Sequence, residues 1–346
     1  MKKTITIHDI AKTANVSSAT VSRVLSNSEY PVSPAMRAKI LKTASELKYI
    51  PNSLGKQLKT NTNMTLGVII PSITNPFYSS VILGIEEIAR SHNYNVLLCN
   101  SHQNPKLEEQ YMKTIFEKQI KGLIISSISK NAKLLKQLID LGLNVIALDQ
   151  EIDEKEVCRI EFDFRKGGYM STTYLIGKGH RNIAYVTSPL DRPSRESIYQ
   201  GYLDAMGQFG LEPMLEEAEA EGEKAFVDGI YEFDNGKRLT GRLLERPNRP
   251  TAIFACNDMT AFGIINELTL QGISVPQDMS VIGFDGIEFG QMITPALTTI
   301  KQPDYEMGRM ACSMLMEMLI ENKKPYLNFM LQPQLIERNS VAGREE

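Results

Sequence analysis

Residues 16–25 of this 346-residue chain read VSSATVSRVL, which surrounds one long cation with small and hydroxylated side chains. One helical stripe is expected from the spacing of Val16, Thr20, Val21 and Val24. The opposite face would carry Ser18, Ala19, Ser22 and Arg23. Hydroxyl groups bond phosphates or base edges, a methyl group contacts thymine, and a guanidinium reaches guanine O6 and N7. This face therefore predicts base reading in the major groove of DNA, where bulky side chains are excluded.

Two short helices joined by a tight turn would position this face. Thr6 is typical of an N-cap for a first helix over about 7–14, and Ser17 of an N-cap for the second. Asn15 suits the turn because asparagine tolerates a positive φ. Ser33-Pro34 would open a third helix that reaches about residue 49. The expected shared core is Ile10, Ala11, Ala14, Val16, Val21 and Val24.

The charge distribution separates the first sixty residues from the rest. Residues 1–60 hold ten Lys or Arg and three Asp or Glu, whereas the remainder carries a net charge of −10. A solvated basic face would explain this simply. With the helix pattern, it favours a nucleic-acid module attached to a body that avoids nucleic acid.

Composition disfavours several classes of protein. No run of 18 apolar residues is present, and the start, MKKTITIHDI, lacks the apolar core of a secretory signal. The four cysteines form no CxxC pair and are expected to be reduced and buried, which indicates a cytoplasmic protein. There is no HExxH, GxSxG, Walker A or GxGxxG motif, and the four histidines lack metal-like spacing. We therefore expect no enzyme activity, no metal and no cofactor.

From Leu66 onward, short apolar runs alternate with amphipathic stretches, which predicts a doubly wound α/β body with parallel strands buried on both faces. The runs are LGVII, NVLLC, GLIIS, NVIALD, NIAYV, TAIFAC and SVIGFD. The second half loosely repeats the layout of the first, which predicts two lobes and a cleft. Asp149 and Asp285 each end a run, at the strand end where open α/β sheets bind ligands.

Along essentially its whole length, the chain resembles the LacI/GalR family of bacterial transcription regulators. The matching segments, in order, are TIHDIAKTANVSSATVSRVLSN, VSPAMRAKILKTASELKYIPN, NPFYSSVILGIEE, GHRNIAYV, RPTAIFACND, VPQDMSVIGFD and PALTTIKQP. Within the family, the pattern is similar to the purine repressor and the catabolite control protein. The resemblance implies an α-helical helix-turn-helix headpiece, a hinge helix and an α/β body of two doubly wound lobes like the periplasmic sugar-binding proteins.

The resemblance also implies the domain limits. The headpiece would cover residues 1–60 with a hinge helix at about 52–59, and the body residues 65–346. The N-lobe is expected at about 65–163 plus 296–326, and the C-lobe at about 164–295 plus 327–343. The family implies a homodimer on a pseudo-palindromic operator. We expect assembly to stop at a dimer, because the closing segment ERNSVAGREE contains no leucine repeat.

In this family a hinge leucine inserts into the minor groove, and Leu58 occupies that position. Gly55 stands where Ala is usual, and Lys56 where Arg is common. Because glycine costs a helix about 1 kcal/mol, we expect this short hinge to be disordered without DNA. The full set expected to contact DNA is Thr6, Ser17, Ser18, Ala19, Thr20, Ser22, Arg23, Lys56 and Leu58.

The same resemblance implies an effector site in the cleft. Aromatic stacking is expected from Phe77 and Tyr78, and hydroxyl or ring-nitrogen binding from Asp149, Asn257 and Asp285. Asp163 is expected to line the cleft, and Gln302 to lie near the crossover between lobes.

The loop PLDRPSRESIYQGY departs from the family pattern. Many members carry an arginine three residues before the glycine, where this chain has Ile198. Arg192 or Arg195 could substitute, which favours a sugar acid or sugar phosphate, because guanidinium groups bind carboxylate and phosphate bidentately. Pairing of these arginines with Glu196 and Asp191 is the alternative.

The expected partners are therefore operator DNA, a small sugar-like effector and a second copy of the chain, with no membrane. A phosphorylated phosphocarrier protein, as used by the catabolite control protein, could act instead of the small molecule or beside it. A transport-type binding protein without DNA function, or a sequence-blind architectural protein, is the remaining alternative.

Overall fold

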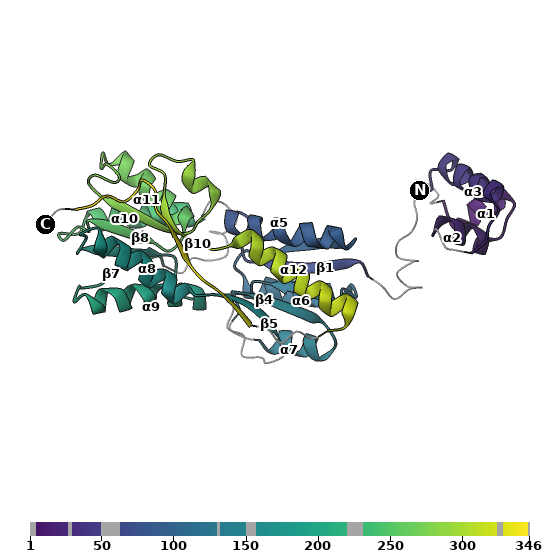
Figure 1. Cartoon of the computed structure of the whole chain (residues 1–346), viewed down its shortest axis with the longest axis horizontal. Coiled ribbons are helices and arrows are strands. Elements are labelled where there is room, and N and C mark those ends of the chain that lie inside the picture. Colours follow the sequence, from purple (N-terminus) through teal and green to yellow (C-terminus); the bar gives the residue numbers. More distant parts are fainter. Residues whose placement is uncertain are drawn as a thin grey trace. The chain divides into compact units, whose positions relative to one another are not determined.

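The computed structural model describes residues 5–26, 30–49, 63–129, 132–149, 157–219, 231–323 and 328–344. The chain divides into two compact units, Met1–Asn63 with the headpiece and Met64–Glu346 with the body (Figure 1). The predicted hinge at about 52–59, with Gly55, Lys56 and Leu58, lies outside the described residues.

The headpiece is the predicted bundle of three helices, α1 (Ile7–Ala14), α2 (Ser18–Leu25) and α3 (Pro34–Glu46). Their N-caps are the predicted Thr6, Ser17 and Ser33, each of which accepts a backbone N–H. Asn15 ends α1 with a φ of 53°. The predicted core is confirmed, and α3 completes it with Ile40 and Ala44. This helix ends at Glu46, earlier than residue 49.

In the N-lobe of the body, the described strands form a parallel six-stranded sheet in the order β11-β5-β4-β3-β1-β2. Their bounds are β1 (Thr65–Ile70), β2 (Asn95–Asn100), β3 (Gly122–Ile125), β4 (Asn144–Leu148), β5 (Cys158–Phe162) and β11 (Asn328–Leu331). Side chains alternate between two buried faces. Leu66 and Val68 pack with α5 (Pro76–Ser91) and α12 (Asp304–Glu321), and Ile69 with α6 (Pro105–Glu117) and α7 (Lys133–Asp140).

The described strands of the C-lobe form a second six-stranded sheet, in the order β12-β10-β9-β8-β6-β7. Their bounds are β6 (Ile183–Thr187), β7 (Met214–Glu217), β8 (Ala252–Ala255), β9 (Ser280–Asp285), β10 (Thr298–Lys301) and β12 (Gln334–Ile336), the last antiparallel to β10. Tyr185 packs with α8 (Phe164–Gly177) and α9 (Pro193–Gln208). Val186 packs with α10 (Tyr231–Leu244) and α11 (Asp258–Leu270). A short 3-10 helix, η2 (Glu288–Gln291), follows β9.

The predicted fold class is confirmed, but two segments belong to the opposite lobe from the one expected. Strand β10 pairs with β9 in the C-lobe, whereas residues 296–326 were predicted for the N-lobe. Strand β11 pairs with β5 in the N-lobe, whereas residues 327–343 were predicted for the C-lobe. Pairing between distant segments decides lobe membership, and the local apolar pattern does not reveal it.

Between the described elements, the chain passes from lobe to lobe three times. The crossovers follow β5 at Asp163, β10 at residues 302–303 and β11 at residues 332–333. None of the described helices is long and apolar enough to cross a membrane.

Three helix pairs approach closely because each partner carries a glycine at the crossing. A Cβ placed on any of these glycines would overlap a backbone carbonyl oxygen of the other helix. The pairs are Gly84 and Gly308 between α5 and α12, Gly168 and Gly201 between α8 and α9, and Gly236 and Gly263 between α10 and α11. Backbone-to-backbone contact of this kind brings Cα–H groups against carbonyl oxygens. Side chains larger than hydrogen are therefore excluded from all three crossings.

His180 fastens the end of the described chain to the C-lobe. It is 3% exposed, its Nδ1 lies 2.9 Å from Thr251 Oγ1, and its Nε2 lies 3.0 Å from Ser280 Oγ and 3.2 Å from the Ala342 oxygen. Burial lowers the pKa of His180, and nearby Arg344 lowers it further. The folded protein therefore favours the neutral imidazole.

We expect His180 to contribute a loss of stability as the pH falls below about 6.5, the ordinary histidine pKa. Unfolded His180 takes up a proton there, while the folded, lowered-pKa imidazole does not, so acid favours unfolding. Thermal unfolding midpoints of wild type and His180→Gln at about pH 7.5 and about pH 5.5 test this. The buried carboxyls act alike in both proteins, so lowering the pH should favour unfolding more in wild type than in the variant, and an equal change in both would contradict the assignment.

Candidate functional site

The first candidate site is the surface of α2. Val21 and Val24 are buried, while Ala19 and Arg23 are exposed and Ser18 and Ser22 partly so, which is the orientation predicted for a DNA-reading face. Ser18 Oγ lies 2.9 Å from His8 Nδ1, so α1 fixes the start of α2. His8 was not anticipated, because its partner lies ten positions away.

Two residues predicted to contact DNA also hold helix ends. Ser17 Oγ accepts the backbone N–H of Thr20 at 3.1 Å and lies 2.8 Å from Thr20 Oγ1, which is partly buried. Thr6 Oγ1 donates to the Asp9 carboxylate at 2.7 Å, while Asp9 also accepts the backbone N–H of Thr6. These hydroxyls order the headpiece, and DNA contacts by Thr6, Ser17 and Thr20 stay a prediction. Those by Lys56 and Leu58 fall outside the described residues.

The second candidate site is a cavity of about 60 Å³ between the two lobes of the body. It lies beyond the carboxyl ends of β1, β4, β8 and β9, which is where open α/β sheets bind their ligands. The structure brings together eight of the nine predicted effector residues: Phe77, Tyr78, Asp149, Arg192, Arg195, Asn257, Asp285 and Gln302.

Within the part of the chain that the structure describes, three polar atoms at this cavity are buried without a hydrogen-bond partner: Asp149 Oδ1, a terminal guanidinium nitrogen of Arg192, and Gln302 Oε1. Burial raises the pKa of Asp149 to about 7, although Arg192 opposes the shift. Burial and the neighbouring Arg195 lower the pKa of Arg192. Unpaired buried polar groups are costly, so these three atoms indicate a place where a polar ligand supplies the missing partners.

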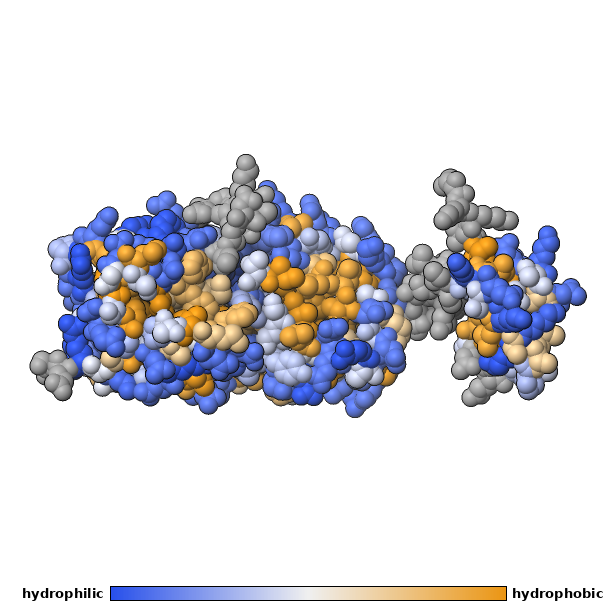
Figure 2. All heavy atoms as spheres, turned by 90° about the horizontal axis from the view of Figure 1, so that it is seen from above, coloured by the Kyte–Doolittle hydropathy of each residue, from blue (hydrophilic) through white to orange (hydrophobic). Residues whose placement is uncertain are grey.

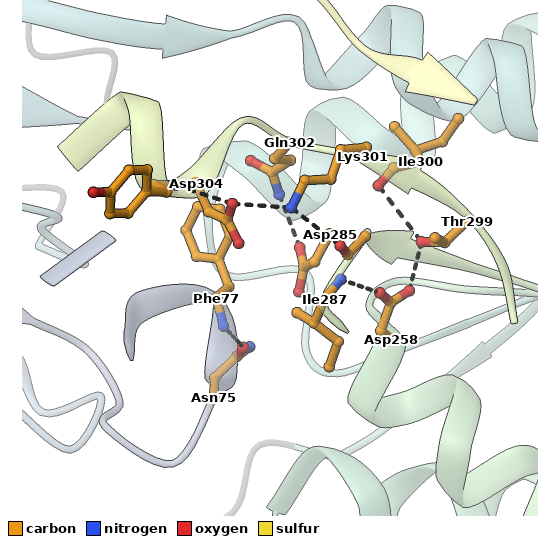
Figure 3. A network of polar contacts seen from close by, with 12 residues as sticks. Asn75, Phe77, Asp258, Asp285, Ile287, Thr299, Ile300, Lys301, Gln302 and Asp304 are labelled. Atoms are coloured by element: carbon orange, nitrogen blue, oxygen red, sulfur yellow. Dashed lines mark hydrogen bonds and ion pairs between the residues drawn. The ribbon is translucent and has the colours of Figure 1, made fainter. Parts of the chain in front are cut away.

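Asp285 sits on a turn that the C-lobe holds at several points (Figure 3). Its φ is 113°, and its Oδ1 accepts from Gln302 Nε2 at 2.8 Å. Beneath the turn, buried Asp258 accepts from Thr299 Oγ1 at 2.6 Å and from the backbone N–H of Ile287 at 2.8 Å. Burial raises the pKa of Asp285, and that of Asp258 to about 7.

Lys301 connects this turn to the other lobe. Its Nζ donates to the Gly286 oxygen at 3.1 Å and to Asp304 Oδ1, at the start of α12, at 2.9 Å (Figure 3). The carboxylate of Asp285 therefore lines the cavity from a turn that Lys301 connects to both lobes.

The two arginines at the start of α9 have different surroundings, since Arg192 is its N-cap residue and Arg195 lies in its first turn. Arg195 is 8% exposed, and its guanidinium donates to the Pro189 oxygen at 3.0 Å and to Asp191 at 3.2 Å. This is the pairing that was the alternative to effector binding. Arg192 instead keeps a buried nitrogen unpartnered, and Ile198 joins the apolar core. The geometry therefore favours Arg192 over Arg195 as the ligand-facing cation.

Two predicted effector residues hold helix N-termini. Asn257 lines the cavity, but its Oδ1 accepts the backbone N–H of Thr260 at the start of α11. Asp163 lies elsewhere: it caps α8 through the Lys166 N–H and lines a neighbouring hollow of about 380 Å³. That hollow shares Asp149 and Phe164 with the cavity. The capping of α8 therefore explains why an aspartate stands at position 163.

Eight cavity residues were not predicted to bind the effector: Ser72, Asn75, Gln103, Phe164, Ser194, Ile198, Glu232 and Cys256. Asn75 followed by Pro76 is a recognisable helix start, since Asn75 caps α5, but nothing local places it in a cleft. The position of Gln103 at the cavity depends on its φ of 57°. The position of buried Glu232 depends on a strand order that only the fold reveals.

Chemically, the cavity offers guanidinium and amide donors, carboxylate acceptors and aromatic rings. This set is typical of a pocket that orients a polar ring compound. Among the described residues, no group of three His, Cys, Asp or Glu side chains is arranged to hold a metal ion.

Comparison with known families matches both units. The profile described as "Bacterial regulatory proteins, lacI family" matches residues 6–52. The profile described as "Periplasmic binding proteins and sugar binding domain of LacI family" matches residues 63–333.

Relatives match over nearly their whole length. The chain is 32% identical over 339 residues to the HTH-type transcriptional repressor PurR of Edwardsiella ictaluri, covering 97% of each chain. It is 34% identical over 312 residues to the catabolite control protein A of Priestia megaterium, covering 90% of this chain and 91% of the relative.

Solved structures agree. The lac repressor dimer bound to operator and the anti-inducer ONPF matches with a TM-score of 0.82 at 25% identity, covering 98% of this chain and all of that one. A LacI family regulator from Enterococcus faecium with bound ribose matches with a TM-score of 0.72 at 28% identity, covering 81% and 100%. The headpiece, the two-lobed body and these matches lead to one conclusion: the chain belongs to the LacI family of DNA-binding bacterial transcription regulators, a family of repressors and not of enzymes.

Proposed function

We propose that this protein is a cytoplasmic repressor that binds a pseudo-palindromic operator through α2 and releases or grips it in response to a hydroxyl-rich ring compound in the interlobe cavity. The observation that carries the effector half is the set of three unpartnered buried atoms on Asp149, Arg192 and Gln302. A sugar presents hydroxyl groups that both donate and accept, so one molecule satisfies all three. The ribose in the regulator from Enterococcus faecium supports this class.

The charges favour a neutral ligand over the sugar acid or phosphate predicted from Arg192 and Arg195. Arg195 is already paired with Asp191, whereas Asp149, Glu232 and Asp285 all line the cavity. An anionic ligand beside these carboxyl groups would either meet the repulsion of those that are ionised or raise their pKa further, and both cost binding free energy. A neutral sugar therefore fits better, with Arg192 donating to ring or hydroxyl oxygens.

A thermal-shift panel of neutral sugars, sugar acids, sugar phosphates and purines tests this proposal. We expect a neutral sugar to raise the unfolding midpoint and to change operator affinity by about tenfold or more, the usual scale of allosteric coupling. Stabilisation by anionic sugars alone would refute the neutral class. No response from any sugar would refute a sugar effector.

We further propose that the operator-binding form is a dimer. Figure 2 shows apolar side chains gathered on a face of the body that carries α5 and α12. There Leu83 is 58% exposed and Ile320 57% exposed. Exposed apolar patches on a soluble protein mark interaction surfaces, and a second copy is the partner that a pseudo-palindromic site requires. Sedimentation at micromolar concentration should give a dimer, and a stable tetramer would contradict this.

A phosphorylated carrier protein is the second candidate signal, favoured by the similarity to the catabolite control protein A. The described α12 surface offers Arg309, which lies 3.7 Å from Glu87 and 3.4 Å from Glu306. A phosphoryl group there would have to displace two carboxylates, so we rank the small molecule first.

Replacing Arg23 by Ala should cost about 1–3 kcal/mol per lost base contact and relax specificity at one guanine per half-site. Selection of binding sites from a random DNA library, with wild type and variant in parallel, measures this directly. Equal losses on operator and random DNA would mean that Arg23 contacts only phosphate.

A further inference from the structure

Tyr30, which lies between α2 and α3 in the chain, contacts Arg23, the arginine for which we predict base reading. The carbon at the centre of the Arg23 guanidinium is 3.9 Å from the centroid of the Tyr30 ring. The ring is not part of the headpiece core, since Tyr30 is 54% exposed. The stack is therefore a surface arrangement of two polar-tipped side chains, and packing alone does not require it.

No carboxylate competes for this guanidinium within the described headpiece. Asp9 is hydrogen-bonded to Thr6, and Glu46 is 3.9 Å from Lys42. Within residues 5–26 and 30–49, the guanidinium face is covered by an aromatic ring while no ion pair uses its N–H groups.

A guanidinium has two kinds of surface. Its flat face attracts an aromatic ring, while its N–H donors all lie in the plane and point outward from the edge. Stacking on Tyr30 therefore leaves the donors free, and bidentate bonding to guanine O6 and N7 uses that edge. From this geometry we infer that Tyr30 is a positioning residue for DNA recognition: its ring holds Arg23 at the orientation in which the arginine reads a base. The inference rests on the proposed role of Arg23.

The backbone that follows Tyr30 is anchored to the headpiece. Val32, two residues on, packs against the headpiece core, and Ser33 caps α3 by accepting the Met36 N–H at 3.3 Å. Arg23 itself lies in the last turn of α2, whose backbone is fixed by buried Val21 and Val24. Both partners of the stack therefore extend from ordered segments, and holding the arginine there lowers the conformational entropy lost on binding.

The test compares full-length wild type with Tyr30→Phe, which keeps the ring, and Tyr30→Leu, which removes it. Arg23→Ala and the Arg23→Ala/Tyr30→Leu double variant complete the cycle. Site selection from a random DNA library gives discrimination at each base pair, and far-ultraviolet circular dichroism verifies that each headpiece is folded.

We expect Tyr30→Leu to reduce discrimination by about two- to fivefold at the base pair read by Arg23, and at that base pair only. Tyr30→Phe should match wild type, and in the Arg23→Ala background Tyr30→Leu should have no further effect there.

Three results would overturn the inference: a uniform loss with Tyr30→Leu at all sequences, an equal loss with Tyr30→Phe, or a gain in affinity that marks the stack as inhibitory. A uniform loss with Arg23→Ala refutes the base-reading role of Arg23 separately, and the inference about Tyr30 with it.

Discussion

An Arg192→Met variant should bind its sugar effector at least about 30-fold more weakly than wild type, a loss of about 2 kcal/mol, while still binding operator DNA. The buried nitrogen of Arg192 has no hydrogen-bond partner among the described residues, so the ligand is expected to supply one. Truncating a buried charged donor costs the bound complex far more than it costs the free protein. The unfolding midpoint without ligand should stay unchanged or rise, because a desolvated and unpaired cation is removed.

Arg195→Met, in the first turn of α9, is the matched control. The Arg195 guanidinium already donates hydrogen bonds to the Pro189 oxygen and to Asp191. That variant should therefore lose stability to unfolding and keep most of its affinity for the sugar. Isothermal titration calorimetry with the sugar that stabilises wild type most, together with thermal unfolding, separates the two patterns. Wild-type affinity in Arg192→Met would show that the ligand does not use this guanidinium.

The second large effect is expected at a helix crossing. Gly236→Ala should destabilise the body by about 3 kcal/mol, at the upper end for overpacking, because the new methyl group would overlap the Thr260 carbonyl oxygen of α11. Backbone cannot rotate away as a side chain can, so α10 and α11 must separate.

Gly241→Ala lies in the same helix and should have the opposite sign. A Cβ there meets nothing within 4 Å, so the variant should gain up to about 1 kcal/mol from helix propensity. Urea denaturation of the full-length protein measures both changes, provided that the slopes agree with wild type. Destabilisation of similar size in both variants would show that the close contact at the crossing does not set the cost.

The sequence allows most of the fold to be predicted, because the predicted strands have strong local signals. Each is an uninterrupted apolar run, as expected for strands covered on both sides. Strand β5 alternates buried and partly buried residues, and β7, β11 and β12 are short edge strands, so none resembles those runs. Their places depend on partners far away in the chain, as the pairing of β11 with β5 illustrates.

For the candidate site, too, some residues could be predicted from local sequence and others depend on contacts between distant parts of the chain. Asp149 and Asp285 could be predicted because each lies at the carboxyl end of a strand in its own sheet, where open α/β sheets bind ligands. The difference between Arg192 and Arg195 could not, since it depends on which guanidinium nitrogen is buried and which reaches Pro189. Likewise, Thr6 and Ser17 satisfy both a capping pattern and a DNA-contact pattern, and only the geometry shows the capping bonds.

The three crossovers have a consequence for how such a regulator can diversify. The headpiece is joined to the body by one passage of chain, so a single recombination event near residue 63 can exchange one DNA specificity for another. Exchanging a whole lobe would need junctions at Asp163, at residues 302–303 and at residues 332–333 together. Headpiece and body can therefore recombine as whole modules through one junction, whereas a new pairing of two lobes cannot arise from any single junction.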